Sequence, residues 1–170
     1  MIQVFTTGGT IDKVYFDAQS EFEIGDPLVA EILRTAGVKF PLEVETLLRK
    51  DSLEITDEDR EVIATAIAET PAERVLITHG TDTMAKTAQV VSARLGSAST
   101  KTVVFVGSLT PARFRESDAE FNVGFAWAAV QTLRPGVYVA MNGQVFDALS
   151  VRKNRAQNRF EDARTSEAAA

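Results

Sequence analysis

Short apolar runs alternate along this chain with longer segments in which apolar residues recur every three or four positions. Such runs are typical of strands buried on both faces, and the longer period is typical of helices. Strands are expected at 2–6, 44–48, 75–77, 103–106 and 137–141, and helices at 26–36, 56–70, 83–95 and 117–133. Strands that alternate with helices form a parallel sheet covered on both faces. The pattern therefore predicts a three-layer α/β fold of the flavodoxin or Rossmann-like kind, with a mostly parallel sheet.

Two of the predicted helices carry local signals that fix their ends or their buried face. Asp26, followed by a proline, is expected to cap the first helix, and Gly37 is expected to end it. In the second helix the periodicity places Val62, Ile63 and Ile67 toward the core.

The pair Asn142-Gly143 after the last expected strand is typical of a hairpin turn. It predicts a C-terminal hairpin that leads into an antiparallel edge strand at 144–146. With 170 residues and no repeat or linker, the chain fits one domain, which would bury about 70% of its unfolded surface. We therefore expect a single domain over 1–170, without a second domain and with a frayed tail at 166–170.

Composition excludes several classes of function. The net charge of −6 disfavours a nucleic-acid partner. The absence of cysteine and the single histidine disfavour disulfides and a zinc site, so neither a metal nor another cofactor is expected. The apolar stretches are too short to cross a membrane, and the N-terminus does not look like a signal peptide. A cytoplasmic protein with no membrane partner is expected.

Open parallel sheets bind ligands beyond the carboxyl ends of their strands. The first strand ends in Thr6-Thr7-Gly8-Gly9-Thr10, where two glycines permit a tight turn that presents a hydroxyl. A purely structural or phosphate-cradling turn is an alternative, although the lysine of a Walker loop does not follow. The segment continues through Tyr15 as a loop of ~15 residues, long enough to suggest a lid.

The third strand ends in residues 78–83, THGTDT, which place hydroxyls and a carboxylate at the start of a helix. Simple helix capping is the alternative to catalysis here. A threonine becomes a useful nucleophile only when another group activates it, and Tyr15, Asp82, Lys86 and Lys153 are the candidates. His79 is expected to be a buried structural hydrogen bonder rather than a base.

Two of these stretches, TTGGTID at 6–12 and THGTDTMAKTA at 78–88, together resemble the signature motifs of the bacterial-type L-asparaginases. The resemblance continues through DSLEIT at 51–56, VGSLTPARFRESDAEFN at 106–122 and MNGQVFDALSVRKN at 141–154. It therefore covers nearly the whole chain. Members of the family usually carry a second, smaller C-terminal domain, so the chain resembles a short single-domain form.

The resemblance implies a role for five catalytic residues. Thr10 would be the nucleophile, in a loop completed by Tyr15. A second catalytic cluster would consist of Thr81, Asp82 and Lys153. Of the two lysines considered above, Lys153 is the one that matches the family. The implied reaction is hydrolysis of L-asparagine to L-aspartate and ammonia through a covalent acyl-enzyme, with no cofactor.

The resemblance also implies which residues bind the substrate. Ser52 would hold the α-carboxylate and Asp82 the α-ammonium, beside Thr81. Gly80 and Ser108 would offer main-chain contacts. Some members have a polar glutamine after the binding serine, where this chain has a leucine.

Other interpretations remain open. One is an amidase that acts on glutamine or on an amidated RNA partner, and the basic residues between Arg152 and Arg164 could then touch RNA, although a solvated helix face is favoured. Another is a non-catalytic module that binds an acidic amino acid. The helix at 120–133 carries Phe121, Phe125 and Trp127, which, with the resemblance, predicts a homo-oligomer, either a dimer or a tetramer.

Overall fold

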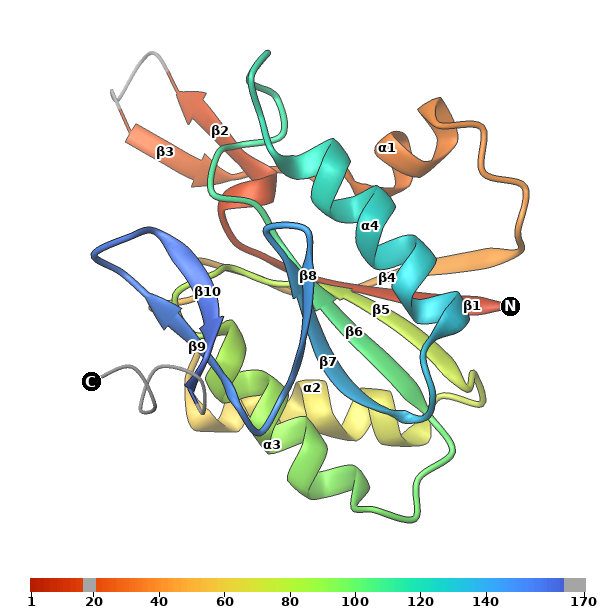
Figure 1. Ribbon diagram of the computed structural model, residues 1–170. Helices are drawn as coiled ribbons and strands as arrows, with labels where there is room; N and C mark the ends of the chain where they lie inside the picture. The colour runs from red at the N-terminus through yellow and green to blue at the C-terminus, as the bar shows by residue number, and fades with distance from the viewer. Residues whose placement is uncertain (17–20, 164–170) are drawn as a thin grey trace.

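A six-stranded sheet forms the centre of the protein (Figure 1). The computed structural model describes residues 1–16 and 21–163. The strands, in spatial order, are β4 (Leu42–Lys50), β1 (Ile2–Gly8), β5 (Arg74–Thr78), β6 (Thr102–Val106), β7 (Gly136–Met141) and β8 (Gln144–Asp147). The first five are parallel and β8 is antiparallel. The predicted sheet is thus confirmed.

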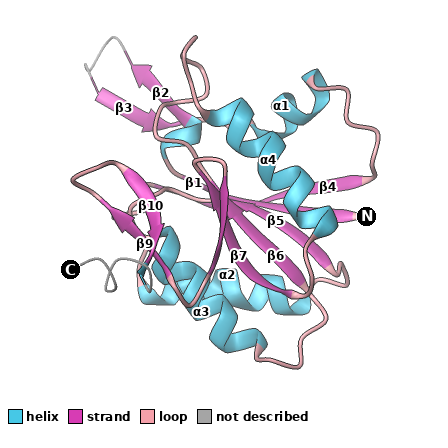
Figure 2. Ribbon diagram, viewed as in Figure 1, coloured by secondary structure: helices cyan, strands magenta, loops and turns pink. Residues whose placement is uncertain are grey.

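Helices cover both faces of this sheet (Figure 2). The pair α1 (Val29–Thr35) and α4 (Ala119–Thr132) lies on one face, and the pair α2 (Asp57–Glu69) and α3 (Met84–Leu95) lies on the other. Ile63 and Ile67 of α2 are buried as predicted, but Val62 is exposed. The prediction for Val62 is wrong because α2 meets its neighbours along a single stripe, and adjacent helix positions point about 100° apart. The three-layer α/β fold is confirmed.

The strand order places a topological switch point between β1 and β5. From β1 the chain crosses to β4 on one side, and it then returns past β1 to β5 on the other side. Ligand sites in open α/β sheets form at such a point, beyond the carboxyl ends of the strands. Thr10 follows β1 and Thr81 follows β5, so both lie at this edge.

The segment after β1 is more ordered than the predicted loop. A 3₁₀ turn, η1 (Thr10–Asp12), leads into the antiparallel strands β2 (Lys13–Phe16) and β3 (Glu21–Ile24), which we call the β2–β3 hairpin. It projects from the sheet at the upper left of Figure 1. Each strand of this hairpin is so short that its alternation of apolar and polar residues does not predict a strand from the sequence.

The start of α1 differs from the prediction. Asp26 does not cap the helix, which begins after Leu28, and the Leu28 N–H donates to Asp12 Oδ1 at 3.0 Å. Asp26 is instead exposed and pairs with Arg49 at 2.9 Å. A carboxylate from outside the helix has replaced the local cap. Gly37, with a φ of 71°, follows the helix as predicted.

The chain after β7 forms two antiparallel pairs. Asn142 and Gly143, with φ angles of 55° and 70°, make the predicted tight turn between β7 and β8. A further pair, β9 (Val151–Asn154) with β10 (Arg159–Asp162), was not predicted. The basic stretch therefore lies on a strand pair and not on a helix face, and Arg164 lies outside the described residues.

Helix α4 has apolar residues on its outer surface as well as in the core. Phe121 is 63% exposed and stacks on Phe125 with ring centroids 6.3 Å apart, whereas Trp127 is buried. The homo-oligomer expected from these residues stays a prediction. Within residues 1–16 and 21–163, no helix has the length and apolar character needed to span a bilayer.

Candidate active site

Two glycines bring three loops together at the switch point. A Cβ added to Gly9 would overlap the main chain of Gly80. A Cβ added to Gly80 would lie 2.6 Å from the Cβ of Ser52. The backbones after β1, β4 and β5 therefore approach as closely as only glycine allows. As a result, Thr10, Ser52 and Thr81 stand on adjoining turns.

Lys153 joins the end of β5 to the C-terminal strand pair. Its ammonium, on β9, donates to Thr81 Oγ1 at 2.8 Å and to Asp82 Oδ1 at 2.9 Å. Only 11% of the lysine side chain is exposed. Partial burial strengthens such charge-assisted bonds relative to those on an open surface. Lys86, the other candidate, points elsewhere and pairs with Asp57 at 2.7 Å.

A second cation stands near the same carboxylate. Arg155, in the turn after β9, places its Nε 3.7 Å from Asp82 Oδ1. Its side chain is mostly exposed. In the sequence, Arg155 stands out only as part of a basic stretch, because nothing in the local pattern shows that the turn reaches the end of β5.

Ser52, which follows β4, is buried and tied to the start of α3. Its hydroxyl oxygen accepts from the Asp82 N–H at 3.3 Å, and its carbonyl accepts from the Thr83 hydroxyl at 2.6 Å. With its oxygen already an acceptor, the Ser52 hydroxyl has its proton to donate to an anionic ligand group. Leu53, the next residue, is exposed.

Ser108 lies at the end of β6, in a loop braced from within. Its hydroxyl donates to the Thr110 carbonyl at 2.6 Å. The Asp118 carboxylate accepts from the N–H groups of Leu109 and Thr110, each at 3.0 Å, and the Asn122 amide donates to the Gly107 carbonyl at 3.1 Å. The bracing by α4 was missed, although the Asp118 and Asn122 side chains stand within the stretch 106–122 that carries the resemblance.

Thr10 and Tyr15 occupy different parts of the site. Thr10 opens the turn η1 and is half-buried beside Gly9. Tyr15 lies on β2 and is 51% exposed, with its ring edge-on to that of Phe22 at 5.5 Å. Phe22 in turn lies 6.2 Å from Phe114 in the loop after β6. Among the described residues no hydrogen bond joins Tyr15 to Thr10, so the structure does not bring these two predicted site residues into contact.

His79 supports the site without titrating near neutral pH. Complete burial lowers its pKa to about 4, against the opposing effect of the Gly80 carbonyl. Its Nδ1 donates to the Gly80 carbonyl at 2.8 Å, and its Nε2 accepts from the Thr87 hydroxyl at 2.9 Å, which assigns a neutral tautomer. The predicted structural role is confirmed, and His79 orients the main chain of Gly80.

An ion pair links the β2–β3 hairpin to the loop that carries Ser52. The Lys13 ammonium lies 2.6 Å from the Asp51 carboxylate. Burial alone would raise the pKa of Asp51, but the hydrogen bonds from Lys13 and from the Leu53 N–H outweigh it and lower the pKa. Asp51 therefore stays ionised at neutral pH and keeps its hold on the hairpin.

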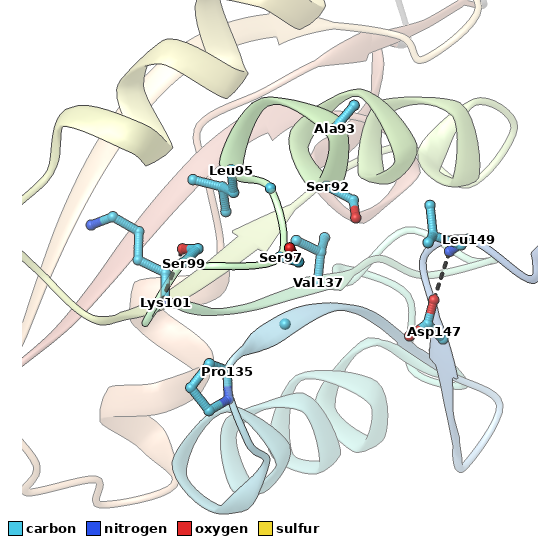
Figure 3. Close-up of a pocket in the computed structure, with 12 residues that line it drawn as sticks. Ser92, Ala93, Leu95, Ser97, Ser99, Lys101, Pro135, Val137, Asp147 and Leu149 are labelled. Atoms are coloured by element: carbon cyan, nitrogen blue, oxygen red, sulfur yellow. Dashed lines mark hydrogen bonds between the residues drawn. The ribbon is translucent and has the colours of Figure 1, made fainter.

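A separate pocket of about 320 Å³ lies at the amino ends of β6 and β7, the opposite edge of the sheet (Figure 3). Ser92, Leu95 and Val137 line it, and its charged residues are engaged by the protein itself. Lys101 points away to the carbonyls of Thr70 and Ala72. Since no reactive group converges there, this pocket is not the candidate site.

In the part of the chain that the structure describes, no group of three histidine, aspartate or glutamate side chains could hold a metal ion. The carboxyl edge of the sheet gathers three hydroxyls, a carboxylate and a shielded ammonium, which belong to Thr10, Ser52, Thr81, Asp82 and Lys153. Such a set can stabilise negative charge and move protons between oxygen and nitrogen.

Comparison with known proteins identifies relatives of this chain. The chain is 33% identical over 157 residues to the L-asparaginase of Thermococcus kodakarensis, a match that covers 88% of the chain and 46% of that protein. It is also 30% identical over 158 residues to one component of the glutamyl-tRNA(Gln) amidotransferase of Methanococcus vannielii, covering 87% of the chain and 35% of that protein.

A solved structure extends the comparison to the fold. The thermostable L-asparaginase from Thermococcus kodakarensis superposes with a TM-score of 0.82 at 29% identity, over 95% of this chain and 50% of that one. The chain thus spans about half the length of such relatives. The family described as "Asparaginase, N-terminal" matches residues 1–167. Because this match extends over almost the whole sequence, the chain belongs to the asparaginase N-terminal family.

Proposed function

We propose that this protein hydrolyses the side-chain amide of L-asparagine, with Thr10 as the nucleophile. The observation that carries the proposal is the pair of bonds from Lys153 to Thr81 and Asp82, next to the turn that bears Thr10. A threonine hydroxyl attacks an amide only when its proton has somewhere to go. A cation on the Thr81 oxygen makes that hydroxyl more acidic and so prepares a proton relay.

In the first step, the Thr10 oxygen bonds to the amide carbon and the C–N bond breaks. The Thr81 hydroxyl gives its proton to the leaving nitrogen, which departs as ammonia, and the proton of Thr10 replaces it. Water then adds to the ester, its proton returns to Thr10, and aspartate leaves. The N–H groups of Thr10 and Thr81 are the donors assigned to the oxyanion.

Substrate binding is assigned to groups at the same edge of the sheet. The Ser52 hydroxyl would donate to the α-carboxylate, and Asp82 would accept from the α-ammonium. Gly80 and Ser108 would contribute main-chain contacts. Tyr15 would hydrogen-bond Thr10 from the β2–β3 hairpin. Asp82 can serve the ammonium and Lys153 together because an ionised carboxylate accepts at several lone pairs.

Ammonia release from L-asparagine tests the proposal directly. Thr10→Ala is expected to reduce kcat by about 10³-fold or more, because it removes the group that forms the bond, while Thr10→Ser keeps a hydroxyl and retains part of the activity. The melting temperature of both variants should match the wild type, since Thr10 is only half-buried. Undiminished turnover by Thr10→Ala would contradict the assignment.

A second candidate is an amidase with another amide substrate, which the 30% identity to the amidotransferase component favours. L-glutamine assayed beside L-asparagine separates the two, because its extra methylene shifts the amide relative to Thr10. A higher kcat/KM for glutamine would support this second candidate. Binding of aspartate with no release of ammonia from either amide would instead indicate a non-catalytic module.

A further inference from the structure

Asp12 is a buried carboxylate to which no role has been assigned above. It ends the turn η1, two residues after Thr10, and only 1% of it is exposed. Its Oδ2 is buried, and no hydrogen-bond partner of this atom is found among the described residues. Carboxylates in such a position are costly, so the fold retains this one at the expense of stability.

The contacts of Asp12 all serve one segment of the chain. Its Oδ1 accepts from the Leu28 N–H at 3.0 Å, and its carbonyl accepts from the Gly25 N–H at 2.8 Å. Its own N–H donates to the Gly9 carbonyl at 3.1 Å. The first contacts fix the return of the β2–β3 hairpin, and the last fixes the glycine turn that carries Thr10. The space around Gly25 is also tight, because a Cβ there would lie 3.0 Å from Val14.

We propose that Asp12 is a positioning residue: its buried carboxyl holds the segment that returns from the β2–β3 hairpin to α1, its main chain holds Gly25 and the nucleophile turn, and together these contacts set where Tyr15 stands relative to Thr10. The proposal rests on the function assigned to Thr10 above. Tyr15 is three residues from Asp12, on β2, and its ring contacts that of Phe22 on β3. The base of the hairpin is therefore the point from which its position is controlled.

Burial and the charged groups around Asp12 set the pH at which its carboxyl ionises. Burial raises its pKa to about 6, against the Leu28 N–H and the positive charges of Arg113 and Arg49. Glu31 and Glu120 line the same hollow as Arg113 and partly offset that cation. An ionised carboxylate accepts a stronger hydrogen bond than a neutral one. The grip on Leu28 should thus tighten as the pH rises through about 6.

The Leu28 amide proton in NMR spectra reports this grip without any variant. In the wild type its chemical shift should titrate with a midpoint of about pH 6, the pKa that burial gives Asp12. In Asp12→Asn the titration should vanish. Asp26→Asn is the matched control, because Asp26 belongs to the same segment but 81% of its side chain is exposed, and the titration should persist there. A Leu28 shift that does not change with pH in the wild type would overturn the proposal.

Hydrogen exchange and kinetics test the consequence for the site. Amides of β2 and β3 should exchange about tenfold faster or more in Asp12→Asn, with those of β5 and β6 unchanged, as for a local loss of anchoring. For L-asparagine, kcat should fall by about tenfold or more. KM should change by less than about threefold in either direction, because misplacing Tyr15 leaves the Ser52 and Asp82 contacts intact. Unchanged exchange and unchanged kcat would overturn the proposal.

The two proposals fail in different ways. If the wild type releases no ammonia from any amide but Leu28 titrates and the hairpin amides respond to Asp12→Asn, the proposed function is wrong and the anchoring by Asp12 stands. If the wild type is active while Leu28 and the hairpin ignore Asp12, the function stands and the role of Asp12 is wrong. A fall in kcat without either NMR response also counts against Asp12, since it would act by another route.

Discussion

The two sides of the candidate site are built differently. On the β5 side, Thr81 and Lys153 are largely buried, and Lys153 is held by two bonds of 2.8 Å and 2.9 Å. On the hairpin side, Tyr15 and Phe22 are half-exposed, and the strands that carry them pair only with each other. The β5 side is thus built on the central sheet, whereas the β2–β3 hairpin is a separate strand pair joined to it.

The difference separates two demands that catalysis makes. Charge stabilisation needs groups that are already in place and poorly screened, which the closely packed ends of the parallel strands provide. Admitting substrate and releasing product need a part that moves at small cost, and regions with few buried contacts open most readily. The protein places its ion pair in the first kind of surroundings and its tyrosine in the second.

The sharpest way to break the β5 side is to remove its cation. Lys153→Met should reduce kcat for L-asparagine by about 10²- to 10³-fold, the usual scale for losing a proton-transfer or charge-stabilising group. Lys86→Met is the matched control, because Lys86 is exposed and pairs with Asp57 on the helix surface. Its kcat should stay within about twofold of the wild type, as for a surface ion pair. Equal losses in both variants would show that the partial burial of Lys153 does not matter.

The fastening of the hairpin should appear in the pH dependence of stability. Burial raises the pKa of Asp12 from its ordinary value of 3.8 to about 6, so between these values the folded chain keeps a proton that the unfolded chain has lost. Through this group, the free energy of unfolding falls by ~2–2.5 kcal/mol as the pH rises from 4 to 7, at ~1.4 kcal/mol per pKa unit.

Urea titrations at pH 4 and pH 7 measure this effect. Relative to the wild type, Asp12→Asn should gain ~2–3 kcal/mol of stability between the two conditions, because its side chain does not ionise. The other carboxylates are common to both proteins and cancel in the difference. Asp26→Asn should show no such gain. A difference of the opposite sign would mean that Asp12 is stabilised by its charge in the folded state.

The smallest expected effect concerns the ion pair between Lys13 of the β2–β3 hairpin and Asp51. The pair is partly exposed, so Lys13→Met should cost ~0.5–1 kcal/mol and lower the melting temperature by ~2–4 °C. Arg94→Met, which breaks a looser 3.6 Å pair with Glu61 between α2 and α3, should lower it by less than ~1 °C. Comparable shifts would place the Lys13 pair among ordinary surface contacts.

Much of the fold could be predicted from the sequence because buried strands and capped helices carry local signals. The apolar runs of β5 and β6 depend only on neighbouring residues, and both strands appear as predicted. The start of α1 could not be predicted this way. Its partner Asp12 comes from 16 residues earlier and competes with the nearer Asp26. Local patterns do not contain such contacts between distant segments.

The candidate site divides along the same line. The hydroxyls after β1 and β5 were found because every parallel strand marks its own carboxyl end. The choice of Lys153 over Lys86 rested on the resemblance and on the argument that correct placement outweighs a screened pair, because the helical spacing of Lys86 from Asp82 is that of a surface ion pair. The sequence did not predict the roles of Arg155 and Asp118 or the ion pair of Lys13 with Asp51. Each acts on residues that are far away in sequence or lie in segments without a regular period.

The bond from Lys153 to Thr81 spans 72 positions of the chain, and three strands of the sheet, β6, β7 and β8, lie between the two residues in sequence. Contacts of such separation form late, because the intervening chain must first give up its freedom. During synthesis the residues of β1, β4 and β5 are all made before β9. If the proposed function holds, we therefore expect a growing chain to carry Thr10 and the strands that position it while still inactive, and to become active only when the β9–β10 pair docks.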